Sequence, residues 1–143
     1  TQGTPVCWAG PVGNIVAGLR KVLSLDAEFI VTGHGALATR HDVELQIAYW
    51  EHIQEELHRR RGLGMTAVEA ASDLLLGHEF QATPFATWDS PERLLRNAQA
   101  LYEEWGERPS RLPDKIARLD TLRRQCLLAL KLPSATPRVM HQR

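Results

Sequence analysis

The stretch LDAEFIVTGHG, residues 25–35, decides the fold. Its centre, residues 28–32, is short and rich in β-branched and aromatic side chains, and Gly33 follows it. This combination predicts a buried β-strand that ends in a tight turn. No other segment of the chain makes a convincing strand, and a lone strand cannot satisfy its own backbone hydrogen-bonding groups. We therefore expect the first 40 residues to belong to a larger sheet whose other strands lie outside this sequence.

Helical patterns fill most of the remaining sequence. Residues 1–13 are expected to be irregular. Beyond them, apolar residues recur every three or four positions, most clearly as a stripe of Val43, Ile47, Trp50, Ile53 and Leu57 and, in the last helix, of Ile116, Leu119, Leu122, Cys126 and Leu130. The expected N-terminal caps are Asn14, Ser90 and the capping box of Thr66 with Glu69, and glycines or prolines end the runs. These signals predict helices over residues 14–25, 41–61, 66–76, 90–105 and 114–132. Residues 78–89 are expected to form a loop. The fold class is therefore α/β but predominantly helical, with one strand near the start.

His34 is the candidate functional residue, because it lies between two glycines directly after the predicted strand. Glycine on both sides permits unusual backbone angles, so the imidazole can project into an open cleft. Neutral imidazole is the commonest metal ligand in proteins and suits zinc. From the spacing alone, a turn histidine that only hydrogen-bonds a carbonyl is the commoner case, and both interpretations stay open.

Residues 25–35 resemble the last metal-binding segment of metallo-β-lactamase-fold hydrolases. In that family a leucine-aspartate-alanine run, a strand and a (P/T)-G-H-G turn carry the final metal-ligating histidine. Other parts of the chain are similar to the same family, namely residues 8–11 with Asn14, then Asp42, Gln46 and Tyr49, and then residues 88–93 with Asn97 and Tyr102. The resemblance covers residues 5–105, and Thr32 stands where the family usually has proline.

The resemblance implies an αββα sandwich with a site for one or two zinc ions, at which a metal-bound hydroxide hydrolyses an ester, thioester, lactone or amide of a small molecule. Residues 1–62 would form the last αβ edge of that sandwich. Residues 63–132 would form a helical C-terminal extension that helps build the substrate mouth or a homodimer contact, and residues 133–143 a flexible tail.

Only His34 carries over as a metal ligand, because the family's H-x-H-x-D-H motif is absent. No catalytic or other cofactor-binding residue can be assigned. A zinc site needs three or four protein ligands. We therefore expect the isolated chain neither to hold zinc tightly nor to turn over substrate.

Composition limits the partners of the chain. Among 143 residues, 17 are basic and 17 acidic, so the neutral total gives no field that attracts nucleic acid or an anionic membrane. Positive charge at the end of a helix explains the run of arginines at 59–61. No apolar run is long enough to span a bilayer and no signal peptide is visible, so a reducing cytoplasm is the default expectation.

The remaining candidates have ordinary structural explanations. His52 and His58 are expected on the surface and His41 at a helix start. The aromatic residues expected in the core are Trp50, Trp88, Trp105, Tyr49 and Tyr102. Cys7 is expected to be structural, and Cys126 to be buried on the apolar stripe of the last helix. The alternative to a hydrolase is a non-enzymatic helical interaction or dimerisation module, because every amphipathic helix between residues 41 and 132 has a stripe that must be covered.

Overall fold

Helices make up 68% of the residues that the structure, a computed structural model, describes: 3–8, 10–34, 36–107 and 114–132. In chain order the helical elements are α1 (Val12–Leu23), α2 (Arg40–Gly62), α3 (Ala67–Leu76), α4 (His78–Gln81), the 3₁₀ turns η1 (Pro84–Thr87) and η2 (Pro91–Arg93), α5 (Leu94–Glu104) and α6 (Asp114–Ala129). Extended pairing among the described residues is limited to two isolated bridges, Gly3 with Asp89 and Ile30 with Ala38. The prediction of a predominantly helical chain is confirmed.

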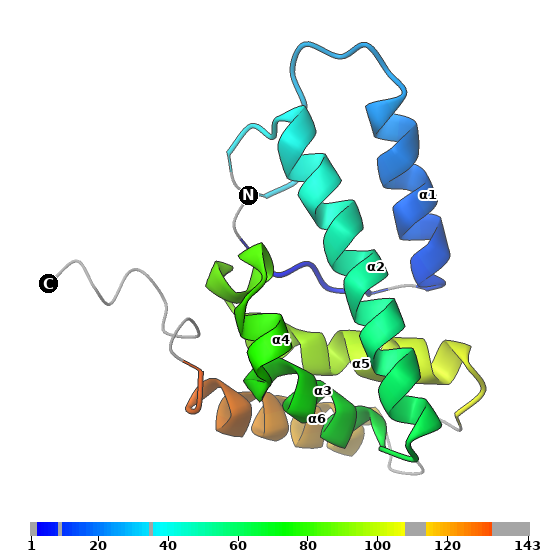
Figure 1. Cartoon of the computed structure of the whole chain (residues 1–143), viewed down its shortest axis with the longest axis vertical. Coiled ribbons are helices and arrows are strands. Elements are labelled where there is room, and N and C mark those ends of the chain that lie inside the picture. Colours follow the sequence, from blue (N-terminus) through cyan, green and yellow to red (C-terminus); the bar gives the residue numbers. More distant parts are fainter. Residues whose placement is uncertain (1–2, 9, 35, 108–113, 133–143) are drawn as a thin grey trace, which may run out of the picture.

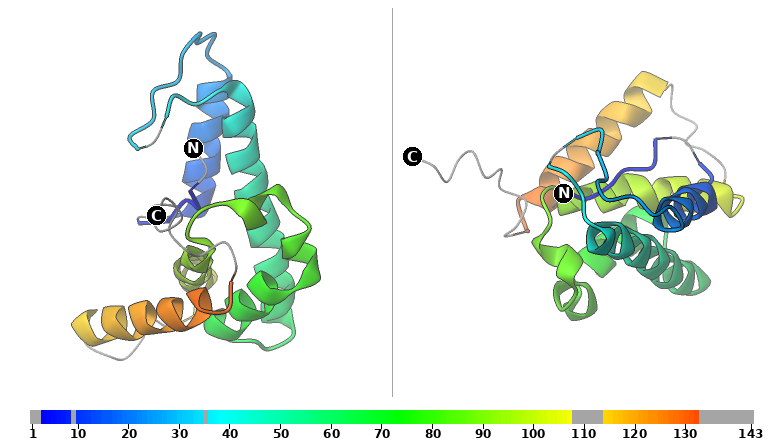
Figure 2. Two further views of the ribbon diagram at one scale, coloured as in Figure 1. Left: turned by 90° about the vertical axis from the view of Figure 1, so that its left-hand side faces the viewer. Right: turned by 90° about the horizontal axis from the view of Figure 1, so that it is seen from above.

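The two N-terminal helices form a hairpin that stands on a base made by the others. Figure 1 shows α1 and α2 side by side, joined by a long loop at one end of the molecule. The helices α5 and α6 lie across the opposite end, and α3 packs between α2 and α5 (Figure 2). The loop between α1 and α2 is therefore remote from α6.

Capping boxes begin two of the helices. The Thr66 hydroxyl accepts a hydrogen bond from the Glu69 backbone N–H, and the Glu69 carboxylate accepts one from the Thr66 N–H, as the sequence predicts. Thr39 and Asp42 form a second box at the start of α2, which the sequence analysis did not identify. Hydrogen bonds from the side chain and backbone of Thr39 lower the pKa of Asp42.

Two predicted helix starts are wrong. Asn14 does not cap α1, which begins at Val12, where the Glu104 carboxylate accepts the backbone N–H at 2.7 Å. This acceptor comes from the far end of α5, so no local signal reveals it. Ser90 has a left-handed backbone (φ 58°) and makes no side-chain cap; the 3₁₀ turn η2 intervenes before α5. Residues 78–89, predicted as a loop, contain α4 and η1.

The core lies where the inner face of α2 meets α3, α5 and the η1 region. All five stripe residues of α2 are buried as predicted: Val43, Ile47, Trp50, Ile53 and Leu57. Tyr49 joins them, with its ring centroid 5.5 Å from those of both Phe85 and Trp88. Burial raises the pKa of Tyr49, and its hydroxyl accepts a hydrogen bond from Asn97 at 2.9 Å. The prediction that the aromatic residues serve packing is confirmed for this cluster.

Asn97 fastens the N-terminal segment to the core. Its fully buried amide accepts a hydrogen bond from the Cys7 N–H at 2.9 Å and donates one to the Pro5 carbonyl at 2.8 Å. The same segment is held at Thr4, whose N–H donates to the Asp89 carbonyl. Residues 3–8 are irregular, as predicted. Thr4 and Cys7 are nevertheless buried, because Asp89 and Asn97 satisfy backbone groups of this segment, whereas Trp8 is 82% exposed.

The orientation of α6 differs from the prediction. Its predicted inner stripe faces outward, and Cys126 on that stripe is exposed. Leu128, on another side of the helix, and Leu132 just after it are the buried residues instead. Both sides of α6 carry leucine, and periodicity alone cannot tell which side faces the body.

Candidate functional site

The candidate site lies in the loop between α1 and α2, residues 24–39, which arches over the end of the helical hairpin (Figure 1). Midway along it the chain turns back on itself. The Ala38 N–H donates to the Ile30 carbonyl at 2.9 Å and closes an antiparallel bridge. His34 lies inside the turn that this bridge closes.

The predicted strand at residues 28–32 is not buried in this structure. Phe29 is 67% exposed and Val31 is 81% exposed, while Ile30 between them is half-buried. Among the described residues, its ladder pairing is limited to the single bridge at Ile30. A strand of this composition needs neighbouring strands to cover it, and the described part of the chain contains none. The prediction of a buried strand is therefore wrong for the chain as it stands, for the reason that the sequence itself indicates.

Thr32 organises the turn that carries His34. Its hydroxyl lies 2.6 Å from the His34 carbonyl oxygen and 3.0 Å from that of Ala36. A proline at this position would have no such group, so threonine replaces ring stiffness with hydrogen bonds. The His34 side chain is exposed to solvent. The turn thus presents an imidazole outward at the end of an uncovered apolar segment.

The described residues do not complete a metal site around His34. No group of three or more histidine, cysteine, aspartate or glutamate side chains comes together in the described ranges. His41 is exposed at the start of α2, 3.9 Å from Glu44, which agrees with the predicted helix-entry position. Because a protein zinc site needs at least three ligands, this part of the chain offers one ligand and does not fit a complete centre.

The other histidines on α2 belong to packing. His52, predicted on the surface, is half-buried, and its ring centroid lies 5.9 Å from that of Phe85 and 6.3 Å from that of Phe80. Its buried Nε2 has no hydrogen-bond partner. His58 is exposed as predicted and contacts Trp105 edge-on, with the ring centroids 5.1 Å apart. The contacts of both histidines are packing contacts, and neither is assigned a role in binding a ligand.

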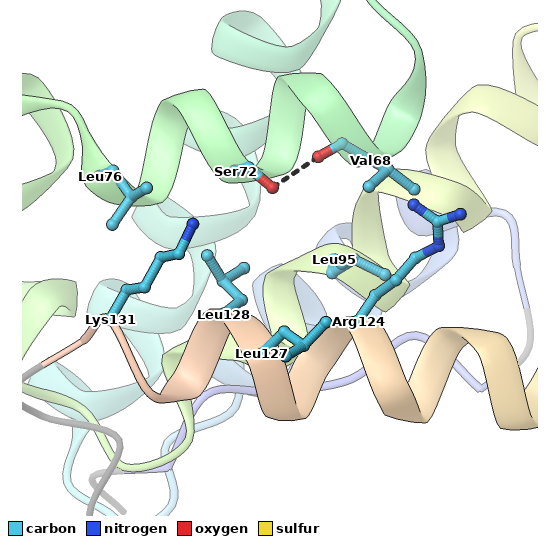
Figure 3. Close-up of a pocket in the computed structure, with 8 residues that line it drawn as sticks. All are labelled: Val68, Ser72, Leu76, Leu95, Arg124, Leu127, Leu128 and Lys131. Carbon is cyan, nitrogen blue, oxygen red and sulfur yellow. Dashed lines mark hydrogen bonds between the residues drawn. The ribbon is translucent and has the colours of Figure 1, made fainter.

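A second candidate is a hollow between α3 and α6. It has a volume of about 170 Å³ and is lined mainly by apolar side chains, with Ser72 in its wall. Figure 3 shows Arg124 at one end, beside Val68, and Lys131 at the other, beside Leu76. The Ser72 hydroxyl donates to the Val68 carbonyl and is not free. The hollow combines an apolar floor with cationic ends.

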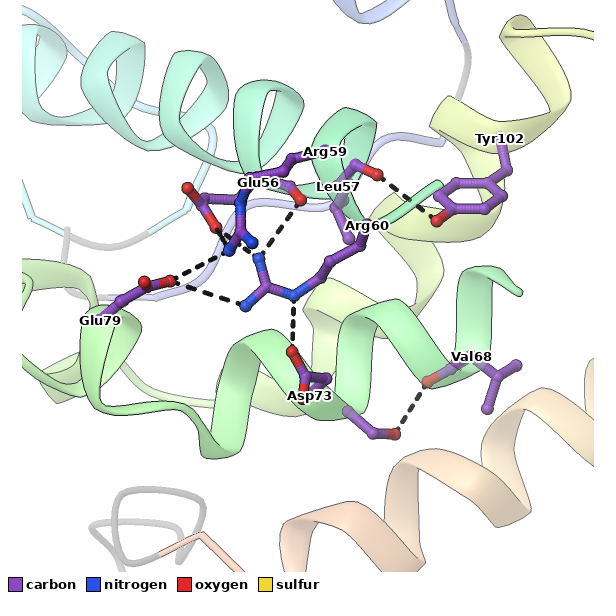
Figure 4. Close-up of polar contacts among 9 residues, drawn as sticks. Glu56, Leu57, Arg59, Arg60, Val68, Asp73, Glu79 and Tyr102 are labelled. Atoms are coloured by element: carbon purple, nitrogen blue, oxygen red, sulfur yellow. Dashed lines mark hydrogen bonds and ion pairs between the residues drawn. The ribbon is translucent and has the colours of Figure 1, made fainter. Parts of the chain in front are cut away.

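A buried arginine forms the third candidate. Arg60 is only 3% exposed, and Figure 4 shows its guanidinium between Glu56, Asp73 and Glu79. It donates to Asp73 at 2.8 Å and pairs closely with Glu56, so every nearby carboxylate is engaged. Burial raises the pKa of Glu56, but hydrogen bonds from Arg59 and Arg60 outweigh burial and leave that pKa low. The cluster ties α2 to α3 and α4, and we assign it a structural role.

Cys7 also has a structural environment. The side chain is 1% exposed, and burial, followed by the nearby Glu104 charge, raises the pKa of its thiol. A thiol held in its neutral form is a poor nucleophile. This agrees with the prediction that Cys7 is structural.

None of the helices in the described ranges is both long enough and apolar enough to cross a bilayer.

Comparison with known proteins finds no match: no family model, no curated protein and no solved structure is similar to the chain. Sequence reasoning singled out His34 and missed the Arg60 cluster. The helical signals of α2 and α3 were visible in the sequence, but the contact between the two helices was not.

Proposed function

We propose that this chain is the C-terminal part of a zinc-dependent hydrolase of the metallo-β-lactamase superfamily, and that His34 supplies one ligand to its metal centre. The supporting observation is the segment from Phe29 to His34. It is an extended, apolar stretch with two large exposed side chains that leads directly into a glycine-flanked, exposed histidine.

The exposure of Phe29 and Val31 supports a missing sheet. These alternate side chains point away from the rest of the chain, whereas Ile30 is half-buried. A further strand beside residues 28–32, with a layer packed over it, would extend their backbone pairing beyond the single bridge at Ile30 and cover both apolar side chains. The αβ edge of a sandwich supplies that arrangement, and it would place His34 at the end of the strand where the family has its last ligand.

The proposal requires the remaining zinc ligands to come from residues outside the described ranges, because no group of three or more potential ligands comes together within them. The resemblance implies metal-assisted hydrolysis of a small-molecule ester, thioester, lactone or amide for the complete protein. No side chain described in this structure is assigned a catalytic role. What the chain contributes is the placement of one imidazole on a short, hydrogen-bonded turn.

The direct test is the native gene product. We would determine the coding sequence upstream of Thr1 and measure the intact mass of the purified natural protein. The proposal predicts an upstream strand-loop with the H-x-H-x-D-H motif in the same polypeptide. A native product that begins near Thr1 would remove the co-ligands of His34 and end the hydrolase proposal.

A helical interaction module is the second candidate function, and its support is that α6 has an exposed apolar face that some other surface would have to cover. Leu119 and Leu130 on that face are 65% and 84% exposed. This function needs no metal ligand. If the native product lacks the upstream motif, the interaction module becomes the better account of the chain.

A further inference from the structure

The neutral total charge conceals two oppositely charged parts. Residues 1–107 contain 8 basic and 15 acidic side chains, a net charge of −7, whereas residues 108–143 contain 9 basic and 2 acidic, a net charge of +7. The total net charge of zero therefore does not describe the local electrostatic field, because charges attract a partner only within a Debye length of about 8–10 Å. The helix α6 lies in the basic part.

An apolar stripe on α6 and the residue just after it contains more exposed large apolar side chains than any other helix in the described ranges. It consists of Ile116, Leu119, Leu122, Leu127 and Leu130, each about half exposed or more. Leu128 packs inward on the opposite side, against the body formed by α3 and α5. Figure 2 shows α6 at the outer edge of the base. The exposure of the five side chains puts the stripe on the solvent side of this helix, with Leu127 at its border with the hollow beside α3.

Cations surround and interrupt this stripe. With 3.6 residues per turn, Arg118 lies along one edge and Arg124 and Lys131 along the other, while Lys115 and Arg123 lie among the leucines. All five are exposed. The helix contains two acids: Asp114 is its first residue, and Asp120 is paired with Arg124 at 2.6 Å. Long cationic side chains keep their charged ends in water while their stems lie along apolar surface, so a stripe of this kind can lie against an acidic lipid surface even with cations among its leucines.

The hollow between α3 and α6, like the stripe, combines apolar surface with neighbouring cations. It opens beside Leu127, its floor is apolar, and Arg124 and Lys131 lie at its two ends (Figure 3). An anionic amphiphile matches both features, since its chain suits the floor and its head group suits the cations. This hollow is an observation independent of the charge count.

A protein partner fits these features less well. The helix is 16 residues long, so its outward face measures about 24 Å by about 10 Å, well under the roughly 800 Å² per partner of a stable protein interface. A second copy would also bring the same positive charges against these. Shallow insertion into a bilayer needs only the stripe itself.

We infer that α6 docks onto an anionic bilayer surface, with its leucine stripe in the interface and its lysines and arginines among acidic head groups. This docking is independent of the metal proposal, because it uses neither His34 nor a metal. It also revises the expectation of no membrane partner, which was drawn from the total charge.

The test is flotation of the whole 143-residue chain with vesicles of phosphatidylcholine alone and of phosphatidylcholine with phosphatidylserine. We expect binding to the acidic vesicles, little to the neutral ones, and a steep loss as salt is raised. Arg118→Glu with Arg123→Glu should weaken binding at least ~10-fold, since each basic residue near such a surface contributes about 1 kcal/mol. Leu119→Asn with Leu130→Asn should weaken it to a similar degree.

Matched controls lie outside α6. Leu63→Asn removes an exposed leucine and Lys21→Glu reverses an exposed cation on α1, and both should leave binding unchanged. Circular dichroism and light scattering check that each variant is folded and monomeric. Absence of binding to acidic vesicles, equal binding to neutral vesicles, or binding that the α6 variants do not weaken each overturns the inference. A dimer that Leu119→Asn with Leu130→Asn dissolves also overturns it, in favour of a second copy.

Discussion

Replacing Asn97 with alanine should loosen the N-terminal segment and destabilise the whole chain. The Asn97 amide is fully buried and makes three hydrogen bonds, one each with the Cys7 N–H, the Pro5 carbonyl and the Tyr49 hydroxyl. Its removal leaves three buried polar groups without that partner. At about 1 kcal/mol or somewhat more for each group, the expected loss is about 2–4 kcal/mol.

Urea unfolding followed by tryptophan fluorescence measures this loss. With a slope of about 2 kcal/mol per molar urea, the midpoint should fall by about 1–2 M. Asn14→Ala is the matched control, because Asn14 is exposed and does not cap α1, so its midpoint should move little.

Thiol labelling gives a second measurement on the same variant. In the wild type, exposed Cys126 should react quickly and buried Cys7 slowly. Asn97→Ala should speed the reaction of Cys7 alone, since the segment that carries it has lost its anchor. If the midpoint of Asn97→Ala matches that of Asn14→Ala and Cys7 stays slow, the reasoning about this buried amide is refuted.

Three further predictions concern the helices. Arg60→Met should lower the free energy of unfolding by about 2–3 kcal/mol, because it leaves the mostly buried Glu56 without its closest partner. Arg59→Met is the control: Arg59 is half-exposed, and its replacement should cost under about 0.5 kcal/mol in the same urea titration. Glu56 has a pKa below its ordinary value of 4.5, so its contribution to stability is present above pH 4.5 and is lost as pH falls through the lowered pKa. Glu56→Gln should therefore flatten the fall in thermal midpoint over that acidic range, and an unchanged pH profile would contradict this assignment. Thr66→Ala removes the capping box of α3 and should cost about 1 kcal/mol in urea, while Thr87→Ala, outside any cap hydrogen bond, should cost less.

Local signals predicted the helices well where the stabilising contacts are local. The stripe of α2 and the capping box at Thr66 depend on residues within a few positions of each other, and both are found as predicted. The Thr39 box was equally local and could have been identified from its T-x-x-D pattern. Predictions failed where a residue far away in the sequence determines where an element begins. The start of α1 is the example, because the Glu104 carboxylate accepts the Val12 N–H.

The same distinction explains the errors on α6 and at the candidate site. Both faces of α6 carry leucines, and packing against α5 and η2 selects Leu128 rather than Cys126. Residues 28–32 have strand composition, but composition cannot supply the neighbours that a strand needs. The exposure of His34 follows from the short turn that Thr32 holds, and whether other ligands meet it is decided outside the described residues.

The most direct test of the central claim is the zinc content of the purified native gene product, with His34→Ala and His41→Ala variants prepared alongside. His41 is an exposed histidine seven positions away that lies 3.9 Å from Glu44, so it controls for loss of any surface imidazole. The account predicts stoichiometric zinc in the wild type and the His41→Ala variant, and a clear loss of zinc in the His34→Ala variant. Zinc content that is unchanged in the His34→Ala variant, or a native product that holds no zinc, would contradict it.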